Sequence, residues 1–529
     1  MTDAATEPLR GWRFLLFVAA LALANVVMLS NVPGYTILVP YAAGNLMGVN
    51  PSFGTWGTTD HMIGIALGLP FARWFAARWG ERRVYAAALV AYALFAAVCA
   101  SAESMWSFLP GRIALGFAGG IAMPLGQALT LGEYAPEHRT VGVGFWGLLS
   151  MMPFTVGVFM GGFWAEYFGW RWLFLSDIVV ALCVAGVVAA LLHGRPHRRR
   201  ITRFDTVGFV LLAAILFGAQ TIFNMGNDFD WLSSPILMTA FVVVAAALPA
   251  FVVWELGERH PVLDLRLFRH RNYAVAVTCS VVGFLFIQGL LSLLIGQLQT
   301  LVGNTSSLAG LVYMMMIFCA APLAAIVHEL NRNIDLRLVA CLNFLGFAVT
   351  LSWLGLYDKL ASFDEIRTPM VFFGFSLAMF FAPLGALAAH GLSGARLTRA
   401  AEELALLRTA AGAFGIALMG VVQFRRAPFH QLSLSEHFGG ARSVSLDLFG
   451  QLSGQLQALG FSAAAAQSQM ARILRQQALV LALDDAFFMG ALTFVFLAFF
   501  VWLAHPAPLA LRLRETLARL RAAEQMEQP

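Results

Sequence analysis

Apolar stretches, each long enough to cross a lipid bilayer, recur along the whole of this chain. A membrane-spanning helix needs about 20 mostly apolar residues, and segments such as Phe14–Thr36, Val207–Phe223 and Phe487–Leu503 supply that length. Lipid offers no hydrogen-bonding partners, so the backbone of such a segment must form a helix or a closed barrel. The stretches are too long and too evenly apolar for barrel strands. With 59% hydrophobic and 12% charged residues, the chain is predicted to be an all-α polytopic membrane protein.

The apolar stretches predict fourteen transmembrane helices in an arrangement of six, two and six. The expected spans are 14–38, 58–77, 84–101, 106–130, 141–163, 171–192, 205–225, 235–256, 272–297, 306–328, 338–357, 368–390, 403–424 and 485–504. Two basic connections, His193–Arg203 and Glu258–Arg271, divide them. The predicted domains are therefore an N-terminal six-helix bundle (1–204), two linker helices (205–271) and a C-terminal six-helix bundle (272–529).

The arginines fix the expected orientation in the membrane. They gather in alternate connections, such as Arg73–Arg83 and Arg259–Arg271, and near both chain ends. Cytoplasmic loops carry an excess of basic residues, so these connections and both termini are predicted to be cytoplasmic. The net charge of +5 is spread over these loops and does not indicate nucleic-acid binding. The chain is expected to be a multi-pass protein of the bacterial inner membrane.

One extramembrane segment is unusually long. Residues 425–484 separate the last two predicted spans, on the periplasmic side by this topology. Connections between bundle helices usually run to about 2–8 residues, so this length needs a cause. Two interpretations remain open, a solvated amphipathic hairpin or a docking surface for a partner protein. Met470, Ile473, Leu474 and Leu481 have spacings compatible with one helical face.

Several motifs occur in order along the chain and together resemble one family. LPFARWFAARWGERRVY at Leu69–Tyr85 resembles the first cytoplasmic-loop signature of the major facilitator superfamily, and RIALG at Arg112–Gly116 resembles its fourth-helix signature. GVFMGG at Gly157–Gly162 and WRWLFLSD at Trp170–Asp177 resemble the fifth- and sixth-helix pattern of the fourteen-helix drug:proton antiporters. The resemblance covers nearly the whole chain, and it is greatest to the EmrB/QacA type and to EmrB-like pump subunits.

The resemblance implies a major facilitator fold, secondary transport by alternating access, and a set of functional residues. A cytoplasmic-loop gating motif would comprise Arg73, Arg78, Gly80, Arg82 and Arg83, and a helix-five motif would comprise Gly157, Gly161 and Gly162. It also implies that residues 425–484 meet a periplasmic adaptor protein leading to an outer-membrane channel. One departure concerns energy coupling, because Asn31 stands where such proteins commonly carry an acid late in the first helix.

Four ionisable residues of the first bundle are the expected proton-coupling group: Asp60, His61, Arg112 and Asp177. A charge at bilayer depth costs about 2.5–3.5 kcal/mol on insertion scales, so each one needs a reason. Asp60, at a depth similar to Arg112, is predicted to pair with it and to carry the proton. The alternatives are an interfacial Asp60–His61 pair, a structural role for Arg112, and a helix-capping role for Asp177.

The predicted substrate cavity has amide and phenol groups on an apolar wall. Its candidate residues are Asn31, Tyr35, Gln127, Gln220, Asn224 and Gln288. Such a lining suits an amphiphilic small molecule better than a sugar or a free ion. No phosphate-binding loop or metal-ligand spacing is present in the sequence, so no enzyme activity and no cofactor or metal are expected, and the proton gradient is the expected source of energy.

The sequence thus favours proton-coupled export of amphiphilic drugs or toxic organic compounds. A dedicated exporter of one endogenous metabolite, lipid or siderophore is the alternative, and a non-transporting membrane scaffold or sensor is a third hypothesis. In the transporter hypotheses the substrate binds near the membrane midplane between the two bundles. The seventh and eighth helices are expected to lie outside that cavity.

Overall fold

The computed structural model describes residues 9–46, 51–135, 139–194, 203–320, 322–323, 326–327, 334–357, 363–439 and 443–506. These residues form helices and connecting turns, and no strand occurs among them. Twelve of the helical segments are long and apolar enough to cross a membrane. The basic residues near the C-terminus that entered the orientation argument lie outside the described residues.

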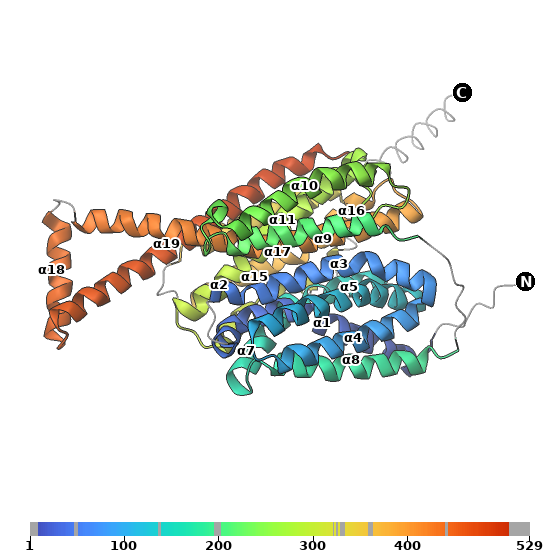
Figure 1. Ribbon diagram of the computed structural model, residues 1–529, viewed down its shortest axis with the longest axis horizontal. Coiled ribbons are helices and arrows are strands. Elements are labelled where there is room, and N and C mark those ends of the chain that lie inside the picture. Colours follow the sequence, from blue (N-terminus) through green and yellow to red (C-terminus); the bar gives the residue numbers. More distant parts are fainter. Residues whose placement is uncertain are drawn as a thin grey trace, which may run out of the picture.

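The N-terminal bundle contains six spans, drawn in blue to blue-green in Figure 1. Its elements are α1 (Trp12–Asn45), the short α2 (Pro51–Gly54), α3 (Trp56–Trp79), α4 (Glu81–Ser101), α5 (Met105–Glu133), the broken span α6 (Arg139–Leu149)–η2 (Pro153–Gly157)–α7 (Val158–Tyr167), and α8 (Trp172–Leu191).

Two linker spans and a second six-span bundle follow. The linker elements are α9 (Thr206–Met225), η3 (Trp231–Ser233), α10 (Pro235–Gly257) and η4 (Leu265–Arg269). The second bundle contains α11 (Arg271–Thr300), α12 (Ser306–Met314), α14 (Leu336–Leu354), the broken span α15 (Phe363–Ala378)–α16 (Phe381–Ala389), α17 (Ala395–Gly439), and α19 (Ala463–Phe500) with η5 (Val501–Leu503). The expected fourteen spans are confirmed once α3 and the shorter apolar helix Ser306–Ala320 join the twelve.

Other helices surround α3, so it can carry more polar residues than spans that face lipid. Gly64 and Gly68 on α3 face backbone carbonyls of α5, and Gly116 and Gly120 on α5 face backbone carbonyls of α3. A Cβ atom at any of these four positions would collide with the opposite backbone. Small residues let two helices approach this closely within a membrane. The two predicted stripes of small residues therefore face each other, and they fix Asp60 and Arg112 on adjacent helices.

The helix-five glycines hold a second close contact, which reaches across to the other bundle. Gly161 lies against the backbone of Gly34 on α1, and Gly162 lies against the backbone of Ser306 at the start of α12. From the other side, a Cβ at Gly310 of α12 would come 2.7 Å from Phe159 Cα on α7. The motif thus packs one span of the N-terminal bundle against both α1 and the C-terminal bundle.

The described residues of the segment 425–484, namely 425–439 and 443–484, form a helical arm that projects from one end of the bundles (Figure 1, left). The arm consists of the outer part of α17, the helix α18 (Ser443–Ala458) and the outer part of α19. The predicted loop is therefore a continuation of two spanning helices. At its base, Arg426 Nε and His430 Nε2 on α17 each contact Asp485 Oδ2 on α19 at 2.6 Å.

The prediction that Met470, Ile473, Leu474 and Leu481 form one apolar face of the arm is wrong in part. Met470 is buried, whereas Ile473 and Leu481 are exposed. The side chains that pack inward from this part of α19 include Ala466, Ala478 and Val480.

The glycine contact between α3 and α5 makes a stability prediction. Gly116→Val should lower the free energy of unfolding by about 1–3 kcal/mol, because the added side chain overpacks a backbone contact. The measurement is the thermal unfolding midpoint of the purified protein. Gly186→Val is the matched control, since Gly186 is a helical glycine of α8 with open space around it. Equal midpoints for the two variants would contradict the close α3–α5 contact.

Candidate functional site

The guanidinium of Arg112 is the centre of a buried polar cluster in the N-terminal bundle. Arg112 is fully buried on α5. Its Nε donates a hydrogen bond to the carbonyl of Gly57 at 2.6 Å, and its Nη1 donates to Asn31 Oδ1 on α1. The guanidinium lies 4.5 Å from the ring centroid of Tyr35 and 5.5 Å from that of Phe174. A cation in this position is held by an amide, a carbonyl and two aromatic faces.

Asn31 connects Arg112 to a carboxyl group. Its Nδ2 donates to Asp177 Oδ2 at 2.5 Å, and the Tyr92 hydroxyl donates to the same oxygen at 3.1 Å. Asp177 is 2% exposed. The order Arg112–Asn31–Asp177 places a positive and a negative group on either side of one amide. The cluster thereby joins α1, α4, α5 and α8.

The expected Asp60–Arg112 pair and the alternative of a helix-capping role for Asp177 are both wrong. Within the described part of the chain, no Asp60 oxygen comes within 4.0 Å of a basic nitrogen, so the expected direct Asp60–Arg112 pair does not form. Asp60 is 6% exposed and lies close enough to interact electrostatically with Arg112. Asp177 does not cap a helix, because α8 begins at Trp172 and Asp177 lies within it. The physical reason is the position of Asn31, whose amide oxygen accepts from Arg112 and whose amide nitrogen donates to Asp177.

His61 lies beside the cluster on α3. It is fully buried, and its Nδ1 lies 3.1 Å from the backbone carbonyl of Arg112. All four predicted coupling residues are therefore found in one buried region. Their role in coupling stays a prediction.

A second feature is a cavity between the two bundles, here called the outer cavity. It has a volume of about 550 Å³ and is lined by α1, α9, α11, α17 and α19. Thr36, Asn224, Gln299 and Arg475 are among its polar lining residues. Residues at the base of the arm, between Phe424 and Gln431 of α17, also line this cavity.

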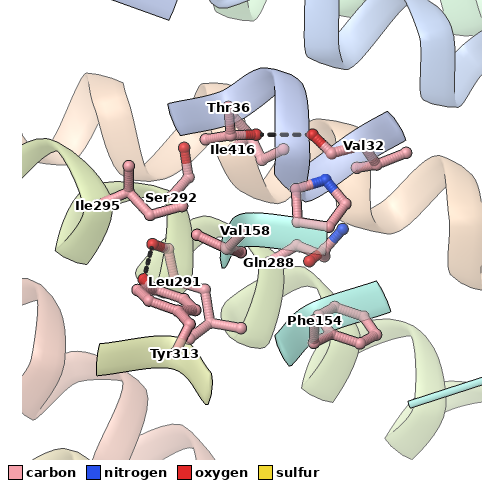
Figure 2. A pocket seen from close by; sticks show the side chains of 11 residues that line it. Val32, Thr36, Phe154, Val158, Gln288, Leu291, Ser292, Ile295, Tyr313 and Ile416 are labelled. Atoms are coloured by element: carbon pink, nitrogen blue, oxygen red, sulfur yellow. Dashed lines mark hydrogen bonds between the residues drawn. The ribbon is translucent and has the colours of Figure 1, made fainter. Parts of the chain in front are cut away.

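Beside the outer cavity lies a small chamber of about 10 Å³, here called the central chamber, which residues of both bundles line. Figure 2 shows Val32 and Thr36 from α1, Phe154 and Val158 from the helix-five span, and Gln288 from α11 around this chamber. Thr36, Ser292, Ile295 and Ile416 line both spaces, so the two spaces are neighbours. The lining of these two spaces near their shared residues is thus mostly apolar, with a few hydroxyl and amide groups.

The predicted cavity residues divide into two groups. Asn224 and Gln288 do line these spaces. Asn31 and Tyr35 instead surround Arg112, because that charge takes the nearest amide and ring. Gln220 is buried without a hydrogen-bond partner, and neither Gln220 nor Gln127 lines the outer cavity or the chamber.

The seventh span was expected outside the cavity, and this is wrong for its outer end. Phe223 and Asn224 of α9 line the outer cavity, together with Asn227 and Asp228 just after it. Asn224 Nδ2 also donates to Thr59 Oγ1 on α3 at 3.0 Å, which brings α9 to the N-terminal bundle. The eighth span, α10, lines neither space.

The loop motif lies at the end of the bundles opposite to the arm. Arg73 Nη1 pairs with Glu402 Oε2 on α17 at 3.0 Å, which links the two bundles. Arg82 donates to the carbonyls of Leu192 at 2.5 Å and Ala189 at 2.9 Å, which caps the last turn of α8. These contacts tie the first loop to two other helices.

The other loop-motif residues have local surroundings. Gly80 has φ 91°, a conformation that favours glycine and that lets α3 turn directly into α4. Arg78 lies 5.7 Å from the Trp74 ring centroid, and Arg83 is exposed.

One membrane-embedded charge was missed by the sequence reasoning. Arg408 lies within α17, inside the span expected at 403–424, with its guanidinium 4.6 Å from the ring centroid of Phe381. The sequence did carry a signal, namely a single basic residue inside an apolar span. Placing such a charge inside the membrane costs free energy, and residues of this kind commonly have a function. Among the described residues, no group of three or more His, Cys, Asp or Glu side chains could hold a metal ion.

Comparison with known proteins settles the family. Residues 14–418 match the model of the Major Facilitator Superfamily. The chain belongs to this superfamily. It is 28% identical over 501 residues to the Multidrug export protein EmrB of Escherichia coli (strain K12), covering 94% of this chain and 97% of that protein. It is 28% identical over 499 residues to the Fatty acid resistance protein FarB of Neisseria gonorrhoeae, with the same two coverages.

Solved structures show the same fold at low sequence identity. The POT family transporter PepTSo matches with a TM-score of 0.58 and 13% identity, covering 93% of this chain and 99% of that chain. The superfamily and the spanning helices confirm that the protein is a multi-pass inner-membrane transporter, rather than an enzyme.

The bridging role of Asn31 makes a second stability prediction. Asn31→Leu should lower the free energy of unfolding by about 3 kcal/mol, because it leaves a buried charge without its partner. Asn31→Asp keeps the acceptor for Arg112 and should be less destabilising. The matched control is Asn25→Leu on the same helix, since the Asn25 amide nitrogen is buried without a partner. If Asn31→Leu unfolds at the wild-type temperature, Asn31 does not bridge the charges.

Proposed function

We propose that this protein exports amphiphilic organic compounds from the cytoplasm or inner leaflet, in exchange for protons, by alternating access. The observation that carries the proposal is the outer cavity, which lies between the bundles and is lined in part by residues at the base of the arm. Its volume of about 550 Å³ falls within the range of about 300–1,000 Å³ for small-molecule sites. Its mixture of apolar, amide and hydroxyl groups suits a molecule with an apolar body and a polar end.

The relatives support export of this substrate class. Two proteins that match along nearly their whole length are named for multidrug export and for fatty acid resistance. One name states export of several drugs and the other states resistance to fatty acids, which are amphiphilic. A dedicated exporter of a single endogenous compound would use the same fold and cavity.

Everted membrane vesicles test the proposal directly. An imposed pH gradient, acidic inside, should be dissipated when an amphiphilic substrate is added, because substrate entry releases protons. The control is vesicles that lack the protein. No dissipation by cationic, neutral or anionic amphiphiles would contradict proton-coupled export.

For coupling, we propose that Asp177 carries the exchanged proton. Asp177 is bonded to Asn31, which lies on α1 about 8 Å along the axis from Thr36 of the cavity wall. A change of charge at Asp177 would alter the hydrogen bonds that join α1 to α4, α5 and α8. Because α1 also lines the outer cavity, protonation and substrate would act on the same helix. Asp60 makes no comparable connection.

Asp177→Asn should therefore reduce pH-driven transport to the background leak while leaving substrate binding intact, since an amide can still accept from Asn31 but cannot exchange a proton. The measurement is substrate-induced proton flux in proteoliposomes, with binding measured in parallel on the purified protein. Asp60→Asn is the matched control and should retain transport. Loss of transport in Asp60→Asn with normal transport in Asp177→Asn would reverse the assignment.

For partners, we propose that the arm meets a periplasmic adaptor leading to an outer-membrane channel. From Phe424, α17 continues outward for about 22 Å at roughly 1.5 Å per residue. Leu459 and Phe461, at the turn between α18 and α19, are exposed by 76% and 41%. Exposed apolar side chains on an extended projection are typical of an interaction site. Because residues of α17 and α19 near the arm's base line the cavity, substrate would leave at the base of such an assembly.

Replacing residues 437–468 by a flexible Gly/Ser linker tests this role. The truncation keeps the Asp485–Arg426–His430 contacts, so the protein should fold and dissipate the pH gradient in vesicles. In intact cells it should no longer confer resistance, because the route to the outer membrane is lost. A matched control is Leu459→Ser with Phe461→Ser, which removes the apolar tip but keeps the helices. Resistance equal to wild type in the truncation would exclude the docking role.

A further inference from the structure

Arg408 is a membrane-embedded cation without a protein counter-charge. It is partly exposed on α17. Its guanidinium lies 4.6 Å from the ring centroid of Phe381 and 5.7 Å from that of Phe284. Within the described part of the chain, no carboxylate oxygen lies within 4.0 Å of it, and it donates no hydrogen bond.

The contrast with Arg112 shows what Arg408 lacks. Arg112 is enclosed and has Gly57, Asn31 and, through Asn31, Asp177. A guanidinium has five N–H donors in a planar fork that suits a carboxylate. Aromatic faces stabilise a cation but accept none of these N–H bonds in the plane of the fork. Arg408 therefore keeps its full capacity to bind an anion.

The rings beside Arg408 lie where the two bundles meet. Phe284 contacts Phe154 at 6.2 Å between ring centroids, and Phe381 at 5.9 Å. Phe154 lines the central chamber and belongs to the N-terminal bundle (Figure 2). The three rings thus form an aromatic layer across the interface of the bundles, with Arg408 against it.

Arg408 lies on the cytoplasmic side of this layer. Along α17 it precedes Ile416 of the chamber by about 12 Å, toward the cytoplasmic end of the helix. A substrate that enters from the cytoplasm or the inner leaflet would meet Arg408 before it reaches the chamber. Phe381 also packs against a cluster that contains Met151 of the helix-five span, so the ring beside Arg408 lies toward the other bundle.

We propose that Arg408 binds the anionic group of a single-tailed amphiphilic substrate, a carboxylate above all, while the tail packs on Phe284, Phe381 and Phe154. This inference rests on the proposed export function and names one substrate class for it. The substrate carboxylate pairs with the guanidinium of Arg408. The two charges then cancel while the bundles change from the inward-facing to the outward-facing arrangement. Binding an anion there would remove the cost of an uncompensated charge inside the membrane.

The test compares two probes with the same tail, dodecanoate and dodecyltrimethylammonium, on the full-length protein in phosphatidylcholine nanodiscs. Arg408→Gln should weaken dodecanoate binding by roughly tenfold or more, the usual effect of losing a hydrogen bond to a charged group. Its affinity for dodecyltrimethylammonium should be unchanged. Arg408→Lys should keep part of the dodecanoate affinity. Arg425→Gln is the matched control, an exposed arginine of the same helix whose guanidinium lies 5.8 Å from the Trp231 ring centroid.

A second measurement does not depend on a variant that folds. Dodecanoate should protect Arg408 of the wild-type protein from modification by phenylglyoxal, measured by peptide mass spectrometry, and dodecyltrimethylammonium should not. Absence of protection overturns the proposal. So does equal loss of both probes in Arg408→Gln.

Two further outcomes separate this inference from the proposed function and from a lipid occupant. A wild-type protein that exports the cationic probe but neither binds nor exports dodecanoate overturns the inference and leaves the export function standing. Failure with every amphiphile in the vesicle assay overturns both. Displacement of dodecanoate by phosphatidylglycerol in the nanodisc would assign Arg408 to a lipid headgroup and overturn the substrate role.

Discussion

The enclosure of Arg112 is the constraint on which the N-terminal bundle depends. A guanidinium that is fully buried at bilayer depth must be balanced, and here Asn31 transmits that balance from Asp177. Removing one partner of a buried charged group costs more than the pair contributes. Helices α1, α5 and α8 are therefore fixed in one arrangement as long as Asp177 carries its charge. A protonated Asp177 leaves that arrangement with a net positive charge.

Close backbone contacts allow this local change to reach the transport path. Glycines bring α3 against α5, and the helix-five span against both α1 and α12. Packed helices at such distances cannot bend gradually, so they move as units. The helix α1 carries Asn31 of the charged cluster and Thr36 of the cavity wall within two turns. In the proposed mechanism, proton and substrate therefore act on the same helix.

Much of the fold could be predicted from apolar length and the spacing of glycines. The carboxyl group linked to Arg112 could not be predicted in this way. The choice between Asp60 and Asp177 depends on which faces of α1 and α8 are turned toward α5. The continuous helices of the arm were also missed, since hydropathy places a boundary where a span becomes polar, even when its backbone stays helical. Asn31 and Tyr35 were assigned to a cavity that the buried charge of Arg112 draws them away from. Arg408 was missed because one charged residue changes the mean hydropathy of a long apolar span only slightly.

The account's central claim is that Asp177, joined to Arg112 through Asn31, changes its protonation during transport. Infrared difference spectroscopy of the purified protein, recorded on addition of substrate, measures this directly through the carbonyl stretch of a protonated carboxylic acid. The account predicts a difference band that is present in the wild type and in Asp60→Asn and absent in Asp177→Asn. A band that survives in Asp177→Asn and disappears in Asp60→Asn would contradict it.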